Sequence, residues 1–185
     1  MIITGVGKMN IVYANNFSLD TLNERQRILS NFLLKFFGDI KSNHNGCTVT
    51  LLGASKNREF RISLAPADKS SYEMVIIVSN LSILLELDGW HEHFYFDKID
   101  LFDCFLAELN NFLIFVLSNM CKMLTYQSNG KDYKWTLVSS DGKVMSSVGI
   151  IIYNYFGKKS IVEKKVVLFS DANVSDASVF LQKYV

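Results

Sequence analysis

The chain has 185 residues, of which 49% are hydrophobic and 20% charged, with a formal net charge of +1. This length fits one domain, and the apolar content excludes an intrinsically disordered chain, because disorder requires low hydrophobicity and high net charge. The near-neutral charge disfavours a nucleic-acid partner, since nucleic-acid-binding domains ordinarily carry a strong basic excess. We therefore expect residues 1–185 to form a single globular domain.

The cysteines and the hydropathy pattern indicate the cellular compartment in which the protein is expected. Cys47, Cys104 and Cys121 are odd in number, widely spaced and set in or beside apolar runs, which indicates free thiols in a reducing compartment. The N-terminus lacks the charged start and long apolar stretch of a signal peptide. The best candidate for a membrane span, residues 99–120, contains several acidic residues, which are costly in lipid. We therefore expect a cytoplasmic protein that binds no membrane.

The first long helix is predicted over residues 18–37. Ser18 is the predicted N-cap, acidic residues follow it, and Gly38 stands after the last periodic residue. Apolar residues recur at spacings of three and four, which indicates one core-facing stripe. A short strand is predicted before this helix, at residues 9–14.

Strands are predicted in the next segment. Residues 47–52 and 59–64 are read as a hairpin, and polar and apolar residues alternate along the second of these strands, as they do in a half-buried strand. Three further strands are predicted at residues 72–78, 83–87 and 90–96, the last of them after the Asp88-Gly89 turn.

A second long helix is predicted over residues 97–122. Asp97 is its predicted N-cap, Asp100 and Asp103 lie near the positive end of the helix dipole, and Lys122 lies near the other end. Its apolar stripe is wide, which is typical of a heavily buried helix.

The last third of the chain is predicted to form hairpins. Residues 133–139 and the strand after Asp141-Gly142 form one, and residues 148–156 and 161–169 form another around a tip at residues 157–159. Residues 174–184 are predicted to form a closing helix. The order of elements predicts an α+β fold: an antiparallel β-sheet with two long helices packed against it, as a single pair of layers or a pseudo-duplicated arrangement.

The near-zero net charge hides a polarised sequence. Residues 82–108 contain seven acidic residues against Lys98 alone, whereas residues 119–165 contain eight lysines against three acidic residues. The lysines at 158–159 and 164–165 have aromatic neighbours, a pattern that suits phosphate contacts. Lysine at hairpin tips and edge strands also prevents aggregation between edges, and this second interpretation is favoured.

The His91-Glu92-His93 motif is the sharpest candidate for chemistry. On a strand, alternation places His91, His93 and Tyr95 on one face and Trp90, Glu92, Phe94 and Phe96 on the other. Two histidines so placed can share a metal, but zinc requires a third protein ligand, for which the candidates are His44, Cys104, Asp97 and Asp88. An exposed strand face that tolerates histidine is the favoured interpretation. We predict no catalytic residue, no metal and no cofactor.

The acidic, aromatic segment is predicted to dock a basic protein, because complementary charge steers such partners and aromatic residues anchor them. The predicted partner-binding residues are Glu86, Asp88, Trp90, Glu92, Asp97, Asp100 and Asp103. An alternative of equal weight is that the aromatic residues belong to the core and the acids are simply solvated.

The stretch Leu87-Asp-Gly-Trp-His-Glu-His-Phe-Tyr-Phe-Asp97 and the helical segment after it, residues 100–120, resemble, in type, the immunity proteins of bacterial contact-dependent or polymorphic toxin systems. The resemblance implies a non-enzymatic, single-domain inhibitor that binds a toxin's nuclease domain and blocks its active site. Such immunity proteins are often acidic overall, and this chain is acidic only locally. Two alternatives remain: a small metal-dependent hydrolase centred on His91 and His93, and a structural or assembly subunit.

Overall fold

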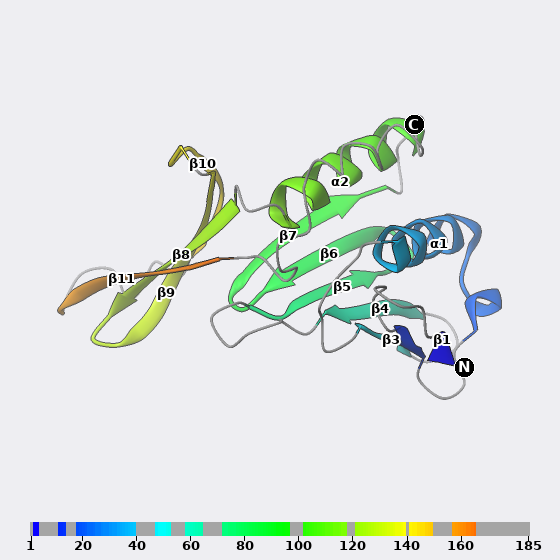
Figure 1. Ribbon diagram of the computed structural model, residues 1–185, viewed down its shortest axis with the longest axis horizontal. Helices are drawn as coiled ribbons and strands as arrows, with labels where there is room; N and C mark the ends of the chain where they lie inside the picture. The colour runs from blue at the N-terminus through cyan, green and yellow to red at the C-terminus, as the bar shows by residue number, and fades with distance from the viewer. Residues whose placement is uncertain are drawn as a thin grey trace.

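The computed structural model describes ten segments of the chain, and the account below concerns these alone: residues 2–3, 11–13, 18–39, 47–52, 58–64, 72–96, 102–117, 121–139, 141–149 and 157–165. These residues form two long helices and two β-sheets (Figure 1), which confirms the α+β class. None of the described helices is long and apolar enough to cross a membrane.

The larger sheet has seven strands in the order β1-β2-β3-β4-β5-β6-β7. Its neighbouring strands are antiparallel except β2 and β3, which run parallel. The strands are β1 (Ile2–Ile3), β2 (Ile11–Tyr13), β3 (Cys47–Leu52), β4 (Glu59–Leu64), β5 (Met74–Val78), β6 (Ser82–Leu87) and β7 (Trp90–Tyr95). The predicted hairpin at residues 47–52 and 59–64 is confirmed with its bounds, as β3 and β4.

The smaller sheet has four strands in the order β10-β9-β8-β11, all antiparallel. The strands are β8 (Cys121–Ser128), β9 (Lys131–Ser139), β10 (Val144–Gly149) and β11 (Lys159–Lys165). The predicted hairpin around Asp141-Gly142 is confirmed as β9 and β10. The predicted pairing of 161–169 with 148–156 is not what β11 shows: it pairs with β8, with Ile161 opposite Tyr126, and residues 150–156 lie outside the described segments.

The first helix starts later than its sequence predicts. Ser18 caps only a short 3-10 helix, η1 (Leu19–Thr21), by accepting a hydrogen bond from the Asp20 amide. The long helix α1 spans Glu24–Asp39. Asn23 and Gln26 exchange hydrogen bonds between side chain and backbone at 2.8 and 3.0 Å, an arrangement that satisfies free amides at a helix start.

The second helix ends earlier than its sequence predicts. Helix α2 spans Phe102–Leu117, and Lys122, predicted near its C-terminus, lies instead in β8. The predicted N-cap, Asp97, lies outside the described residues. Apolar residues in 121–124 continue the helical pattern, so periodicity alone cannot separate the strand from the helix before it.

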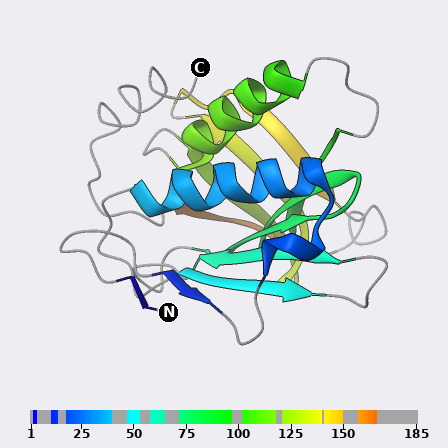
Figure 2. The same cartoon turned by 90° about the vertical axis from the view of Figure 1, so that its right-hand side faces the viewer.

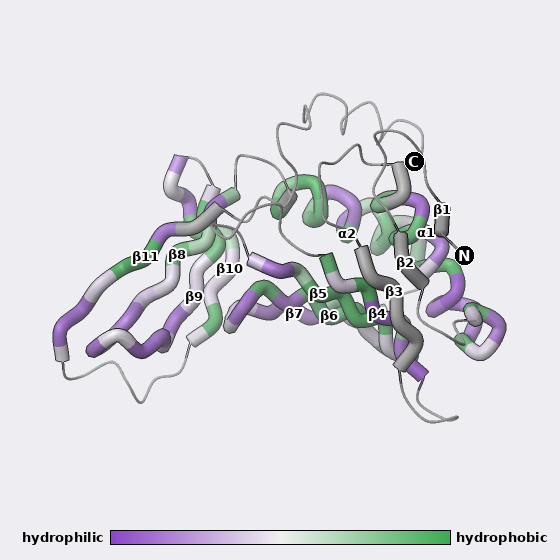
Figure 3. The backbone as a smooth tube through the Cα atoms, turned by 60° about the horizontal axis from the view of Figure 1, so that its bottom comes forward, coloured by the Kyte–Doolittle hydropathy of each residue, from purple (hydrophilic) through white to green (hydrophobic). Residues whose placement is uncertain are grey.

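Both helices cover one face of the seven-stranded sheet (Figures 2 and 3). The side chains that β4, β5 and β6 direct towards them are buried, among them Phe60, Ile76 and Leu85 at 0% exposure. Strand β8 adds Cys121 and Met123 to the same hydrophobic cluster. A buried hydrogen bond of 2.9 Å between the hydroxyls of Tyr72 and Thr125 also joins the two sheets.

Candidate functional site

Strand β7, at the end of the larger sheet, directs its side chains to two different environments. Trp90 is buried, and Phe94 packs with it against the helix side, whereas His91, His93 and Tyr95 are exposed on the opposite side. The alternation predicted from the sequence is therefore the one that the structure shows. We call the sheet face that carries the three exposed rings, opposite α1 and α2, the open face.

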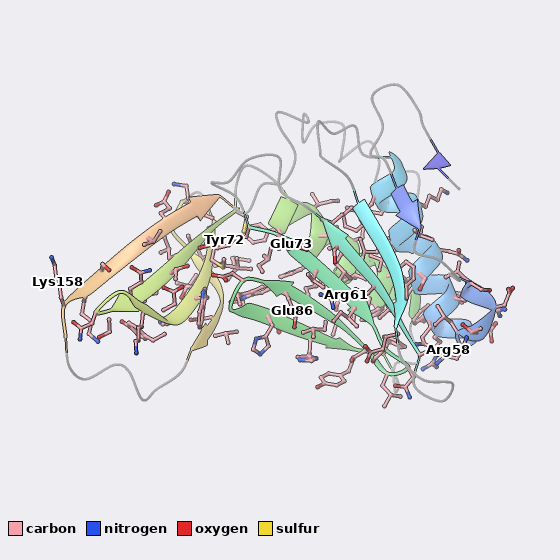
Figure 4. All side chains as sticks on the ribbon, turned by 90° about the horizontal axis from the view of Figure 1, so that it is seen from below. Arg58, Arg61, Tyr72, Glu73, Glu86 and Lys158 are labelled. Atoms are coloured by element: carbon pink, nitrogen blue, oxygen red, sulfur yellow. The ribbon has the colours of Figure 1, made fainter. Side chains whose placement is uncertain are left out.

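The strand register defines which residues share the open face. His93 lies opposite Leu84, which lies opposite Ile77, which lies opposite Arg61. In the neighbouring row His91 lies opposite Glu86. Residues that pair directly in antiparallel strands project on the same side, and Figure 4 shows Arg61 and Glu86 on this side of the sheet.

The three exposed rings of β7 form a continuous row, which we call the ring row. The centroids of His91 and His93 are 6.0 Å apart, and those of His93 and Tyr95 are 5.9 Å apart and stacked. Tyr95 is 63% exposed. Mutual ring contacts restrict the side-chain rotamers, so this exposed surface is partly ordered before any partner binds.

The open face is acidic at one end. Glu86 is half-buried beside the ring row, and Glu73 precedes β5 on the same side of the sheet. Met74 pairs with Leu87, and this register brings Glu73 to the end where Asp88 follows β6. Arg61 is three strands away from His93, roughly 14 Å at the usual strand spacing. Negative charge therefore lies closer to the ring row than the positive charge of Arg61 does.

On its helix side, β7 belongs to the core. The Trp90 ring is stacked with the Phe112 ring of α2, with the ring centroids 6.1 Å apart. The Phe94 ring meets the Phe112 ring edge-on, at 5.1 Å. Trp90 is 0% exposed. Trp90, one of the predicted partner-binding residues, therefore lies in the core, because α2 covers the helix-side face of β7.

Glu92 joins the two sheets. The Trp90 indole donates a hydrogen bond to the Ser146 hydroxyl of β10 at 3.3 Å, and that hydroxyl donates to the Glu92 carboxylate at 2.7 Å. The carboxylate thus accepts an internal hydrogen bond in a half-buried position. The structure gives Glu92 a role in holding β10 against β7.

Asp88 takes part in a second connection between the sheets. The Trp135 indole of β9 donates a hydrogen bond to the Asp88 carboxylate at 3.3 Å. A Cβ atom at Gly89 would overlap the Trp135 ring, so the indole lies directly on the turn between β6 and β7. We call the contacts of Asp88, Gly89, Trp90 and Glu92 with Trp135 and Ser146 the sheet junction.

The predicted partner-binding residues that the structure describes on β6, the following turn and β7 lie on more than one side of the sheet. Glu86 lies on the open face, and Asp88 is exposed at its edge. Trp90 and Glu92 lie on the other side of β7. Asp97 and Asp100 lie outside the described residues, and Asp103 lies in α2.

Sequence reasoning did not single out Glu73 as part of the acidic end. Glu73 stands near the start of β5, 15 positions before Asp88 in the numbering, and only the pairing of β5 with β6 brings the two together. The alternation of residues 73–77 was a usable signal, because it places Glu73 on the same side as Ile77.

The structure offers limited support for a metal centre. His91 and His93 project from the same side of β7, and zinc requires at least one more protein ligand. Among the described residues, no group of three or more His, Cys, Asp or Glu side chains is arranged to hold a metal ion. His44 and Asp97 lie outside those residues.

The two described thiols occupy different environments. Cys104 is exposed on α2, and Cys121 is buried at the start of β8. Burial raises the pKa of the Cys121 thiol to about 12, because a thiolate is poorly solvated in an apolar environment. Cys121 is therefore a small apolar core residue and not a nucleophile.

No protein-family model, curated protein or solved structure matches this chain. Any assignment of function therefore has to come from the geometry of the open face and the charges around it.

Proposed function

We propose that this chain is a non-enzymatic protein-binding protein that docks a basic protein on its open face. More specifically, we propose that it is an immunity protein that neutralises a toxin's nuclease domain. The observation that carries the proposal is the ring row of His91, His93 and Tyr95, exposed beside Glu86 on a sheet face that neither helix covers.

The ring row suits the centre of a protein interface. Aromatic residues contribute large contact areas at a low cost in side-chain entropy and are enriched among residues that dominate binding energy. Leu84 and Ile77 lie half-exposed beside the rings, so the aromatic surface continues into an apolar one. Tyr95 is 63% exposed, so a partner that covers it would remove a large apolar area from water, which favours binding.

The charges near the ring row favour a basic partner. Glu73, Glu86 and Asp88 lie at one end of the open face, and clustered charge steers a complementary partner and raises the association rate. A nuclease domain has a basic substrate-binding surface, because it must neutralise phosphates. A sheet face with acidic residues at its edge is suited to covering such a surface.

The first test measures binding of two matched charge-reversal variants to the toxin domain encoded beside this chain's gene. Glu86→Lys places a positive charge next to the ring row and is expected to weaken binding about tenfold or more, mainly through slower association. Glu108→Lys makes the same change on the exposed side of α2 and is expected to leave the affinity within about twofold. Equal affinities for the two variants would contradict the proposed surface.

The second test removes a ring. Tyr95→Ala is expected to weaken binding at least about tenfold, chiefly through faster dissociation. Ile28→Ala is the control, because Ile28 is an exposed apolar residue, at 41%, on α1. Both variants are first compared with the wild type by thermal unfolding, so that a loss of binding is read only from folded protein.

The immunity assignment has its own test, because a protein-binding surface alone does not specify a toxin. A gene for a large secreted protein with a variable C-terminal domain, next to the gene for this chain, is expected. Co-expression of this chain should then restore growth to cells that produce the toxin domain. A metabolic operon at that position, or no protection from the adjacent toxin domain, would reject the assignment.

A further inference from the structure

A cluster of lysines and tyrosines lies at one end of the four-stranded sheet. The Lys134 ammonium lies 5.1 Å from the centre of the Tyr126 ring, and the Lys159 ammonium lies 4.8 Å from that of Tyr133. The two tyrosine rings are themselves in contact, at 6.4 Å. We call Lys131, Lys134, Lys158, Lys159, Tyr126 and Tyr133 the lysine–tyrosine cluster.

Three strands contribute to this cluster. In the register, Lys134 lies opposite Tyr126, and Lys159 and Lys131 both lie opposite Ser128. Lys158 is fixed close by, because its amide donates to the Asn129 side chain at 2.9 Å and its carbonyl accepts from the Asn129 amide at 3.0 Å. Figure 4 shows Lys158 at the far end of the sheet from the helices.

Protection of an edge strand does not account for every lysine of the cluster. Among the described strands, β11 is an edge of the sheet, and lysine there blocks pairing between edges. Lys131 lies beside the β8–β9 turn, where a lysine can serve the same purpose. Lys134, however, is paired on both sides, with Gly149 of β10 and Tyr126 of β8. It protects no edge, so its position needs another reason.

The nearby acidic residues leave the cluster with an excess of positive charge. Asp132 accepts a hydrogen bond from the Gln127 side chain at 2.7 Å. The ion pair that the structure shows among the described residues, between Lys122 and Glu163 at 2.7 Å, lies four positions along β8 from Tyr126. Asp132 keeps its negative charge in this hydrogen bond, so four lysines against one aspartate (4 − 1) leave a net charge of +3 among the described residues at this end of the sheet.

We propose that the lysine–tyrosine cluster is a docking site for an acidic segment of a protein. The carboxylates of such a segment would meet ammonium groups that the tyrosine rings already hold in place, which lowers the entropy lost on binding. This second site is separate from the open face and does not depend on the function proposed for it.

An acidic protein segment fits the cluster better than a single-stranded nucleic acid. Stacking platforms for bases need an open aromatic face, and here a lysine ammonium lies over each ring while Tyr133 is only 8% exposed. The whole chain has a net charge of +1, so it lacks the long-range field that attracts a polynucleotide. A short acidic segment needs only a local group of cations.

A second copy of this chain is disfavoured at the edge of β11 in the register centred on Val162. Antiparallel pairing of two β11 strands about Val162 would place Lys159 opposite Lys165 of the other copy, and Ser160 opposite Lys164. Like charges directly opposite one another destabilise a strand pair. An acidic segment meets the same lysines with the opposite charge.

The experiment titrates the full chain against a fluorescent peptide in which glutamate alternates with serine, in low salt on the order of 50 mM. The double variant Lys134→Gln/Lys159→Gln is expected to weaken binding about tenfold. The control, Lys35→Gln/Lys143→Gln, removes the same charge from exposed lysines on α1 and in the β9–β10 turn. It is expected to change affinity by less than about twofold.

A second variant guards against misfolding of the first. Lys131→Gln/Lys158→Gln alters two exposed side chains and is expected to weaken binding of the peptide about fivefold or more. Equal losses in the control and cluster variants would overturn the proposal, and so would the absence of peptide binding by the wild type. Tighter binding of oligodeoxythymidine of equal charge would assign the cluster to nucleic acid instead and also overturn it.

Discussion

The two faces of β7 lie in different surroundings. On the helix side, Trp90 and Phe94 pack against Phe112, and Glu92 is hydrogen-bonded to Ser146 of the other sheet. On the open side, the ring row is exposed and touches mainly itself. Neighbours in sequence are thus separated into a set that packs within the fold and an exposed set, because successive strand residues point to opposite faces.

This difference teaches that local composition alone does not define a surface. The acidic, aromatic segment looks uniform in sequence, yet Glu86 and Glu92 lie on different sides of the sheet. The binding energy of a partner and the stability of the fold should therefore respond to different residues of the same strand.

The largest expected effect separates two adjacent residues of β7. Trp90→Ala removes a fully buried ring from the core and is expected to lower the free energy of unfolding by about 3–5 kcal/mol. His91→Ala changes an exposed residue and is expected to stay within about 0.5 kcal/mol. Urea unfolding of both variants gives the comparison. Similar losses for the two would show that the faces of β7 do not differ in this way.

A smaller effect is expected at the turn that begins β7. Gly89→Ala would place a methyl group in the position of the Trp135 ring, and the displaced indole is expected to cost about 1–3 kcal/mol of unfolding free energy. Gly149→Ala is the milder control, because its added Cβ would lie 3.2 Å from Lys134 and from the Tyr133 carbonyl, whereas the Cβ at Gly89 would overlap the Trp135 ring. Unfolding curves followed by tryptophan fluorescence measure both. An unaffected Gly89→Ala protein would place Trp135 away from the turn.

The last effect appears only at alkaline pH and concerns the core that the two sheets share. The folded protein raises the pKa of Cys121 from 9.0 to about 12 by burial, so it favours the neutral thiol. This contribution is fully present below pH 9 and is lost as the pH rises towards 12, at a slope of at most about 1.4 kcal/mol per pH unit. Cys121→Ala should flatten the alkaline part of the stability curve relative to that of the wild type. Rapid alkylation of Cys121 in the native protein at neutral pH would contradict its burial.

Elements whose sequence pattern lies within one short segment could be predicted from the sequence. The hairpin of β3 and β4 has apolar alternation along its second strand and a polar connection, and these short-range patterns specify strand, turn and face together. The two-face character of β7 followed from the same alternation. The core-facing stripe of helix α1 was predicted correctly. The start of the helix was predicted too early, because Ser18 and Asn23 are both good caps.

Other features depended on contacts between residues far apart in sequence. Strand β8 follows α2 after a short gap, and its first residues are as apolar as the end of the helix. Only pairing with β9 and β11 makes this segment a strand, because a helix is stabilised within itself whereas a strand needs neighbours. The sheet junction of Trp90, Trp135 and Ser146 has no sequence signal for the same reason.

The sequence by itself determined the α+β class, the β3–β4 and β9–β10 hairpins and the shared face of His91, His93 and Tyr95, because each follows from a pattern along a single segment. Only the tertiary structure decided that Trp90 and Glu92 bind their own second sheet, and that Glu73 joins Glu86 and Asp88. The physical reason is that alternation assigns a side chain to a face, while only the register between distant strands decides which other residues share it.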